Sequence, residues 1–146
     1  MTDTIARFES LLKTVPARLV DLGEDAVAHK PAADRWSKKE LLGHLIDSAG
    51  NNHQRFVRAQ GTPRLGFPEY EQEFWVATQA YATESWPDLV NLWLLLNRHL
   101  VHVVKAMPAG VLSHEVVIGA GPAMTLEALV AGYLGHLEHH LAQLLG

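Results

Sequence analysis

Cysteine is absent from this 146-residue sequence, which excludes disulfides, thiolate metal ligands and a cysteine nucleophile. Any thiol chemistry must therefore use a thiol that a ligand brings. No apolar run reaches the roughly 18 residues of a membrane span, and the first residues lack the apolar region of a signal peptide. Long basic runs are also missing, and the net charge is −4. We therefore expect a soluble cytoplasmic protein that binds neither nucleic acid nor membranes.

Hydrophobic residues make up 48% of the chain, and histidine occurs nine times. A chain of this length is typical of one domain, here residues 1–146, and can bury a core without disulfides. The histidine content is the unusual feature of the composition. It directs attention to histidines that lie beside apolar helix faces.

The first two of four segments with helical apolar spacing occupy the N-terminal part of the chain. One runs from about residue 4 to residue 22, and Pro16 inside it predicts a kink or a break. The other begins at Ser37, which with Glu40 forms the sequence pattern of a capping box, and continues to about Arg58. These signals predict two long amphipathic helices.

The other two segments follow a long connection between residues 61 and 85. "TPRLGFP" in this connection is typical of a turn-rich loop, and a short helix is expected after it. Ser85 predicts the start of the third long helix, Pro108 its end, and Thr125 the start of the fourth. Residues 114–125 hold at most a short extended piece, too small for a sheet. The whole pattern predicts an all-α protein, an antiparallel four-helix bundle with a long middle connection.

The fourth segment carries histidines at positions 136, 139 and 140. A helix turns by about 100° per residue, so His140 falls inside the apolar arc, His136 borders it, and His139 points towards solvent. Two inward histidines one turn apart can bind one metal ion. The pair is half of a metal site, and a third ligand is expected from another helix.

The second segment offers that third ligand in His44. Polar residues follow it one to three turns later, namely Ser48, Asn51 or Asn52, and Arg55. This polar stripe borders the apolar face of the same helix, which favours a lined pocket over a merely wet surface. Arg55 could hold an anionic group of a ligand, or could lie at the surface as most arginines do.

Other interpretations of these residues remain open. Taken alone, His44 fits a hydrogen-bonded core histidine, and His99 with His102 forms a rival half-site. Asp47 could orient an imidazole N–H group, or could complete a site of two histidines and one carboxylate that favours iron. Glu138 could also orient an imidazole, but it points away from the apolar arc.

The stretch "RWSKKELLGHLIDS", followed by "ESWPDLVNLWLLLNRHL" and "YLGHLEHHLAQLL", resembles the DinB/YfiT-like superfamily. The resemblance covers residues 8–145. It implies a four-helix bundle with a divalent-metal site made of three histidines, here His44, His136 and His140. The favoured metal is zinc, with nickel or iron as alternatives.

The resemblance also implies classes of activity. Relatives include transferases that use low-molecular-weight thiols such as bacillithiol or mycothiol, and a mycothiol-dependent maleylpyruvate isomerase. We hypothesise that the metal activates such a thiol to attack a small-molecule electrophile, in an S-transferase. The alternatives are a non-catalytic, stress-related bundle that binds metal or a small ligand, and a purely structural bundle. Apolar residues expected to be exposed in the connection, Phe67, Tyr70 and Trp75, favour a homodimer.

Overall fold

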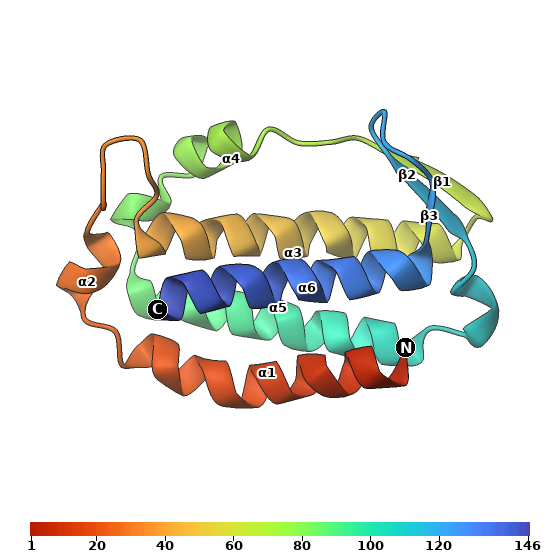
Figure 1. The fold of residues 1–146 in the computed structure, drawn as a ribbon, viewed down its shortest axis with the longest axis horizontal. Helices are drawn as coiled ribbons and strands as arrows, with labels where there is room; N and C mark the ends of the chain where they lie inside the picture. Colours follow the sequence, from red (N-terminus) through yellow and green to blue (C-terminus); the bar gives the residue numbers. More distant parts are fainter.

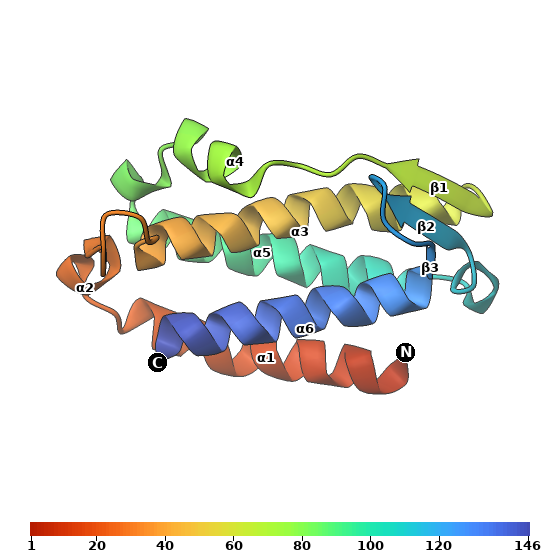
Figure 2. The same cartoon turned by 45° about the horizontal axis from the view of Figure 1, so that its top comes forward.

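The computed structural model describes residues 1–146 and contains four long helices (Figure 1). They are α1 (Thr2–Val20), α3 (Lys38–Gln60), α5 (Trp86–Ala106) and α6 (Leu126–Leu145). Helix α3 packs against α5 and α6, and α1 packs against the same two helices, so α1 and α3 lie diagonally opposite (Figure 2). The predicted four-helix bundle is therefore present. None of the helices is both long enough and apolar enough to cross a membrane.

The long middle connection determines the directions of the helices. It contains β1 (Arg64–Phe67), α4 (Gln72–Thr78) and the 3-10 turn η1 (Tyr81–Thr83), and it runs back along the outside of α3 (Figure 1). Helix α5 consequently starts at the same end of the bundle as α3 and runs in the same direction. Helix α6 runs antiparallel to α3, which brings the C-terminal half of α6 beside the N-terminal half of α3.

The predicted helix starts are confirmed. Ser37 accepts a hydrogen bond from the backbone N–H of Glu40, and the Glu40 carboxylate accepts one from the backbone N–H of Ser37. Ser85 accepts a hydrogen bond from the backbone N–H of Asp88 at the start of α5, and Thr125 accepts one from that of Ala128 at the start of α6. Helix α1 continues through Pro16 to Val20, so of the expected kink or break at this residue the break does not occur. A short helix, α2 (Glu24–Ala28), leads from α1 towards α3.

A small sheet corrects two expectations. Strand β2 (Glu115–Ile118) pairs in parallel with β1 and antiparallel with β3 (Met124–Thr125), after the 3-10 turn η2 (Ala109–Val111). Residues 64–67 are thus a strand and residues 114–125 do contribute to a sheet. Their partners lie about fifty positions apart in sequence, as for Arg64 and Glu115, so no local pattern could reveal the pairing. The sheet lies beside the C-terminal end of α3 (Figure 2).

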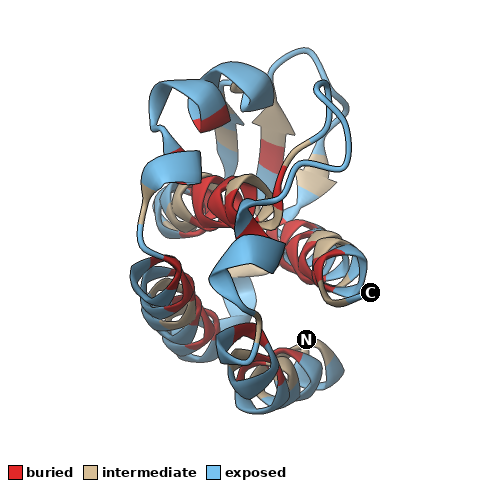
Figure 3. Cartoon of the chain, turned by 90° about the vertical axis from the view of Figure 1, so that its left-hand side faces the viewer, coloured by how far each residue is buried: buried red, intermediate tan, exposed pale blue.

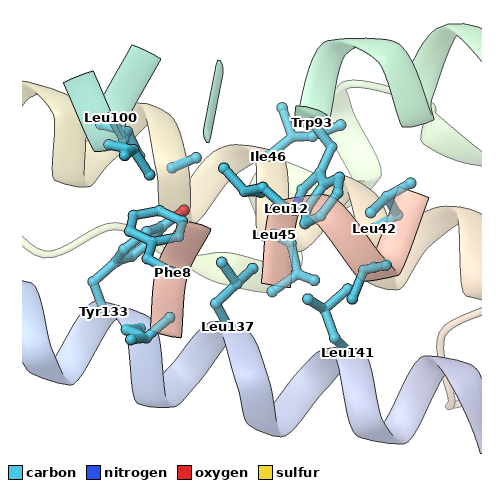
Figure 4. Close-up of a cluster of buried hydrophobic side chains, with 14 of the residues drawn as sticks. Phe8, Leu12, Leu42, Leu45, Ile46, Trp93, Leu100, Tyr133, Leu137 and Leu141 are labelled. Atoms are coloured by element: carbon cyan, nitrogen blue, oxygen red, sulfur yellow. The ribbon is translucent and has the colours of Figure 1, made fainter. Parts of the chain in front are cut away.

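The core fills the space between the four helices (Figures 3 and 4). The apolar spacing of α5 would place Leu92 on its inward face, but Leu92 is 46% exposed, whereas the polar Asn97 is fully buried. Asn97 donates a hydrogen bond to the carbonyl of Trp93 and accepts one from the Tyr133 hydroxyl at 2.5 Å. Leu92 lies about 100° from the buried Trp93, which turns it out of the interface. The largest fully buried side chains are Trp93, Phe8, Phe56 and nine leucines.

Candidate metal centre

Three histidines from two helices meet where α3 and α6 pack together. His44 comes from α3, and His136 and His140 come from α6. The Nε2 atoms of His44 and His136 are 3.2 Å apart, and one ring nitrogen from each of the three residues lies within 4.8 Å of the others. The ring centre of His44 is 5.1 Å from that of His136 and also 5.1 Å from that of His140. The structure therefore brings together the three residues that the sequence marked as metal ligands.

Each histidine owes its position to its helix. His136 and His140 are one turn apart on the face that α6 presents to α3, and their ring centres are 4.5 Å apart. His44 lies on the facing side of α3 and is 1% exposed. Trp36, just before the start of α3, places its ring 5.0 Å from that of His44. This indole packs beside the imidazole of His44, and it lines the same hollow as His140.

Burial keeps the two innermost imidazoles neutral. Burial, together with smaller contributions from the neighbouring imidazoles of His136 and His140, lowers the pKa of His44 to about 4. Burial likewise lowers the pKa of His136 to about 4, with additional contributions from His140 and His139. Neutral imidazole is the form that binds metal ions, because a protonated nitrogen has no lone pair to donate.

The outer ring nitrogens on α6 face oxygen atoms. The Oε1 of Gln143 accepts a hydrogen bond from Nδ1 of His140 at 3.0 Å, and the Ser48 hydroxyl is 3.5 Å from Nδ1 of His136. A proton held on Nδ1 leaves the Nε2 lone pair free to face the centre of the cluster. Nδ1 of His44 is buried without a partner. Gln143 was not recognised from the sequence, although its spacing of three residues from His140 is a usable signal.

The donor set fits a divalent cation such as zinc. Two ligand nitrogens at about 2.0–2.1 Å from a tetrahedral ion are roughly 3.3–3.4 Å apart. The 3.2 Å between His44 and His136 is close to this length. Two neutral imidazoles joined by a hydrogen bond reach a similar separation, so the distance alone does not separate a metal site from a hydrogen-bonded core. A hydrogen-bonded pair of His44 and His136 would give no role to the imidazole of His140, which lies beside the same two rings, whereas a metal site uses all three.

Asp47 does not join this cluster. Its Oδ1 accepts hydrogen bonds from the Tyr81 hydroxyl at 2.7 Å and from Gln79 at 2.8 Å, while Oδ2 is buried without a partner. Burial raises the pKa of Asp47, and the hydrogen bonds from Tyr81 and Gln79 oppose this shift. Three residues after His44, Asp47 points about 60° to one side, towards the connection, whereas Ser48 points about 40° to the other, towards α6. The expected contact of Asp47 with an imidazole is therefore replaced by one to Tyr81.

The polar stripe of α3 is formed by Ser48, Asn52 and Arg55. Asn51, the other residue considered for it, does not line the cavity beside the stripe, whereas Asn52 does. Beyond this stripe lies a cavity of about 520 Å³. Its lining includes the three stripe residues, His136 of α6 and Tyr70 of the connection. The expected lined pocket thus exists, and it opens directly beside one histidine of the cluster.

A second hollow lies on the other side of the cluster. Its volume is about 450 Å³, and Trp36, Lys38, His140 and Gln143 are among its lining residues. A third hollow, of about 510 Å³ between α1 and α6, contacts none of the three histidines. Ligands can therefore approach the cluster from the side of His136 or from the side of His140.

The remaining histidines lie outside the cluster. His139 is exposed, as expected, and His99 and His102 stack on the outer side of α5 with ring centres 6.3 Å apart. The ring centre of His53 on α3 is 5.2 Å from that of His99. This contact joins two helices, so spacing along the sequence could not predict it. Glu138 forms a salt bridge with Arg7 of α1 and touches no histidine.

Two aromatic residues of the connection are less exposed than expected. Phe67 is half-buried, with the guanidinium of Arg55 5.2 Å from its ring centre. Tyr70 is also half-buried, and its ring centre is 5.2 Å from that of Trp75. Both pack beside α3 rather than projecting from the surface, so Trp75, 37% exposed, is the one residue of the three that remains exposed.

Gly43 was also missed as a determinant of the site. A side-chain carbon at this position would lie 2.1 Å from a ring carbon of Tyr81, so only glycine lets Tyr81 reach Asp47. Its place inside a helix gave only a weak signal, because glycine lowers helix stability at any interior position and Gly50 of the same helix has no close neighbour.

The bundle and its buried histidines define a class of protein, a helical bundle with a candidate metal centre between two helices. The chain belongs to the DinB superfamily, whose family model matches residues 7–144. It is 27% identical over 139 residues to a candidate metal-dependent hydrolase of Halalkalibacterium halodurans, an alignment that covers 91% of this chain and 80% of the relative.

Two solved structures share the fold. YfiT of Bacillus subtilis, described as a probable metal-dependent hydrolase with an unusual four-helix bundle topology, superposes with a TM-score of 0.82 at 18% identity. That match covers 99% of this chain and 85% of YfiT. A mycothiol-dependent maleylpyruvate isomerase superposes with a TM-score of 0.80 at 13% identity, over 98% of this chain and 60% of the isomerase.

Proposed function

We propose that this protein is a divalent-metal-dependent enzyme in which His44, His136 and His140 hold the metal. The observation that carries the proposal is the convergence of three ring nitrogens within 4.8 Å, beside a cavity large enough for a small molecule. Three protein ligands leave a coordination position for a substrate or a water molecule. Zinc is the favoured metal, and nickel or iron is the alternative.

The proposed reaction is the transfer of a low-molecular-weight thiol to an electrophile. A divalent cation held by these three residues would supply Lewis-acid chemistry, which favours the thiolate form of a thiol bound beside it. Ser48 and Gln143 would orient His136 and His140, and Trp36 would shield His44 from solvent. The chain contains no cysteine, so the thiol has to arrive as a co-substrate. The thiol-dependent isomerase with the same fold supports this class of reaction.

Hydrolysis is the second candidate function. It is supported by the relative from Halalkalibacterium halodurans and by YfiT, both described as metal-dependent hydrolases. The same three histidines would serve, with water in place of the thiol as nucleophile. A non-catalytic bundle that binds metal or a small ligand is the remaining alternative.

A single assay series separates these functions. Metal-loaded protein is incubated with a generic electrophile and with bacillithiol, mycothiol or glutathione, and separately with ester and amide substrates without thiol. We expect metal-dependent conjugation of at least one thiol, lost in His136→Ala and retained in His139→Ala. Hydrolysis without thiol would favour the second candidate. No turnover with either set would leave a binding protein and contradict the proposed enzyme.

A further inference from the structure

Arg55 is a buried cation without a counter-ion. Its side chain belongs to a residue that is 7% exposed, and its Nε is buried with no hydrogen-bond partner. None of the six salt bridges of the structure includes it. Lys39, the other buried basic residue, is paired with Glu24. Of the two buried residues that are lysine or arginine, Arg55 is thus the one that forms no salt bridge.

An unpaired buried charge is unfavourable for folding. Transfer of a cation out of water is costly unless a counter-ion or hydrogen bonds compensate it. Burial lowers the pKa of Arg55, yet a guanidinium keeps its proton throughout the physiological range. The contact with the ring of Phe67 compensates only part of the cost, because cation–π contacts are weak relative to full desolvation. The protein itself therefore provides no counter-ion for the Arg55 side chain.

The cavity beside the metal centre is where that partner would bind. Arg55, Ser48 and Asn52 line the same cavity as His136. Its single carboxylate, Glu69, belongs to an exposed residue and forms no salt bridge with Arg55. Ser48 and Arg55 are seven residues, or about two turns, apart on α3, so their side chains lie on the same face of the helix.

We propose that Arg55 binds an oxyanion of the substrate, a carboxylate or a phosphate, while the reacting end of the same molecule reaches the histidine cluster. The binding of the oxyanion by Arg55 does not depend on the proposed function; only the placement of the reacting end at the histidine cluster rests on it. The proposal defines the substrate class as a small anionic molecule whose charged group and reacting atom both fit in the cavity that Arg55 and His136 line. A guanidinium is suited to this role because its planar N–H groups match both anions.

Tyr70 adds a donor to the same site. Its side chain lines the cavity with Arg55, and burial together with the charge of Asp47 raises its pKa. The phenol therefore stays protonated near neutral pH and can donate a hydrogen bond to an oxyanion. Asn52 also lines the cavity, although its amide N–H is used within α3 by the carbonyl of Ser48.

The test measures anion binding without turnover. Thermal unfolding and calorimetric titration are carried out with inorganic phosphate and, separately, with butyrate, against chloride at matched ionic strength. We expect one of the two anions to raise the melting temperature of the wild type by binding to the folded state. Arg55→Gln should weaken this binding by about 10- to 100-fold, the usual effect of losing charge-assisted hydrogen bonds. The anion that binds identifies the group that the natural substrate carries.

Arg58→Gln is the matched control. Arg58 lies on the same helix one turn later, is exposed, and donates a hydrogen bond to Gln54. This variant should bind the anion as the wild type does. Arg55→Met, which keeps the apolar stem against Phe67, should fold at least as stably as the wild type in chloride, because it removes an unpaired buried charge. No anion response in the wild type, or an unchanged response in Arg55→Gln and Arg55→Met, would overturn the proposal.

The metal centre and the oxyanion site can fail independently. Anion binding by chelator-treated His44→Ala, which lacks a ligand of the metal site, should equal that of the chelator-treated wild type. If the anion binds but no metal does, the proposed function fails and Arg55 still marks an anion site. If metal binds and turnover occurs without any dependence on Arg55, the inference of this section is wrong and the proposed function stands.

Discussion

Substitution of Gly43 by alanine tests how closely the connection packs on α3. The added carbon would lie 2.1, 2.3 and 2.6 Å from three ring carbons of Tyr81, where carbon atoms normally stay about 3.5–4.0 Å apart. Tyr81 is 3% exposed and its hydroxyl is bound to Asp47 and Gln79, so the ring has little freedom to move. Overpacking of this kind costs about 1–3 kcal/mol of unfolding free energy.

Gly50→Ala is the matched control within the same helix. No atom lies within 4 Å of a carbon added at Gly50, so this variant gains only helix propensity, about 1 kcal/mol. Gly43→Ala gains the same helix propensity, but the clash with Tyr81 opposes this gain. In urea unfolding, the free energy of unfolding of Gly43→Ala should therefore be about 1–3 kcal/mol lower than that of Gly50→Ala. The double variant Gly43→Ala/Tyr81→Ala should recover part of that difference relative to Tyr81→Ala alone. Equal stabilisation by Gly43→Ala and Gly50→Ala would refute the packing argument.

Two further predictions concern buried polar groups. His44 and His136 have pKa values of about 4 in the folded protein and about 6.5 when unfolded, so the unfolded state binds more protons between these values. In urea unfolding of chelator-treated protein, the contribution of these two groups to the free energy of unfolding should be complete above pH 6.5 and should decrease as the pH falls towards 4. His44→Ala should flatten this pH dependence, and His139→Ala should leave it unchanged. An equally steep curve in His44→Ala would contradict the assignment. Tyr133→Phe leaves the buried Oδ1 of Asn97 without its donor and should cost about 1–3 kcal/mol in urea unfolding, whereas a neutral effect would show that this hydrogen bond is not needed.

The features that the sequence predicts correctly depend on neighbours along one helix. The caps at Ser37, Ser85 and Thr125 require only contacts within one turn, and the inward faces follow from the helical period. The facing of His136 and His140 is of the same kind. Local rules therefore recover the helices and the side of α6 that carries the histidines.

The features that the sequence misses depend on partners distant in the chain. The parallel pairing of β1 with β2 joins segments separated by α4 and α5. The contact of Asp47 with Tyr81 and the burial of Arg55 against Phe67 both require the connection to fold back on α3. No spacing within α3 indicates whether its polar residues meet α6, the connection or solvent.

The convergence of the three imidazoles is tested most directly by metal analysis of protein purified without an affinity tag. We expect about one divalent ion per chain in the wild type, bound with neutral imidazole ligands. His44→Ala, which removes the one ligand from α3, should lose the ion, and His139→Ala should retain it. Absence of bound metal in the wild type after incubation with zinc, nickel or iron, or full occupancy in His44→Ala, would contradict the account.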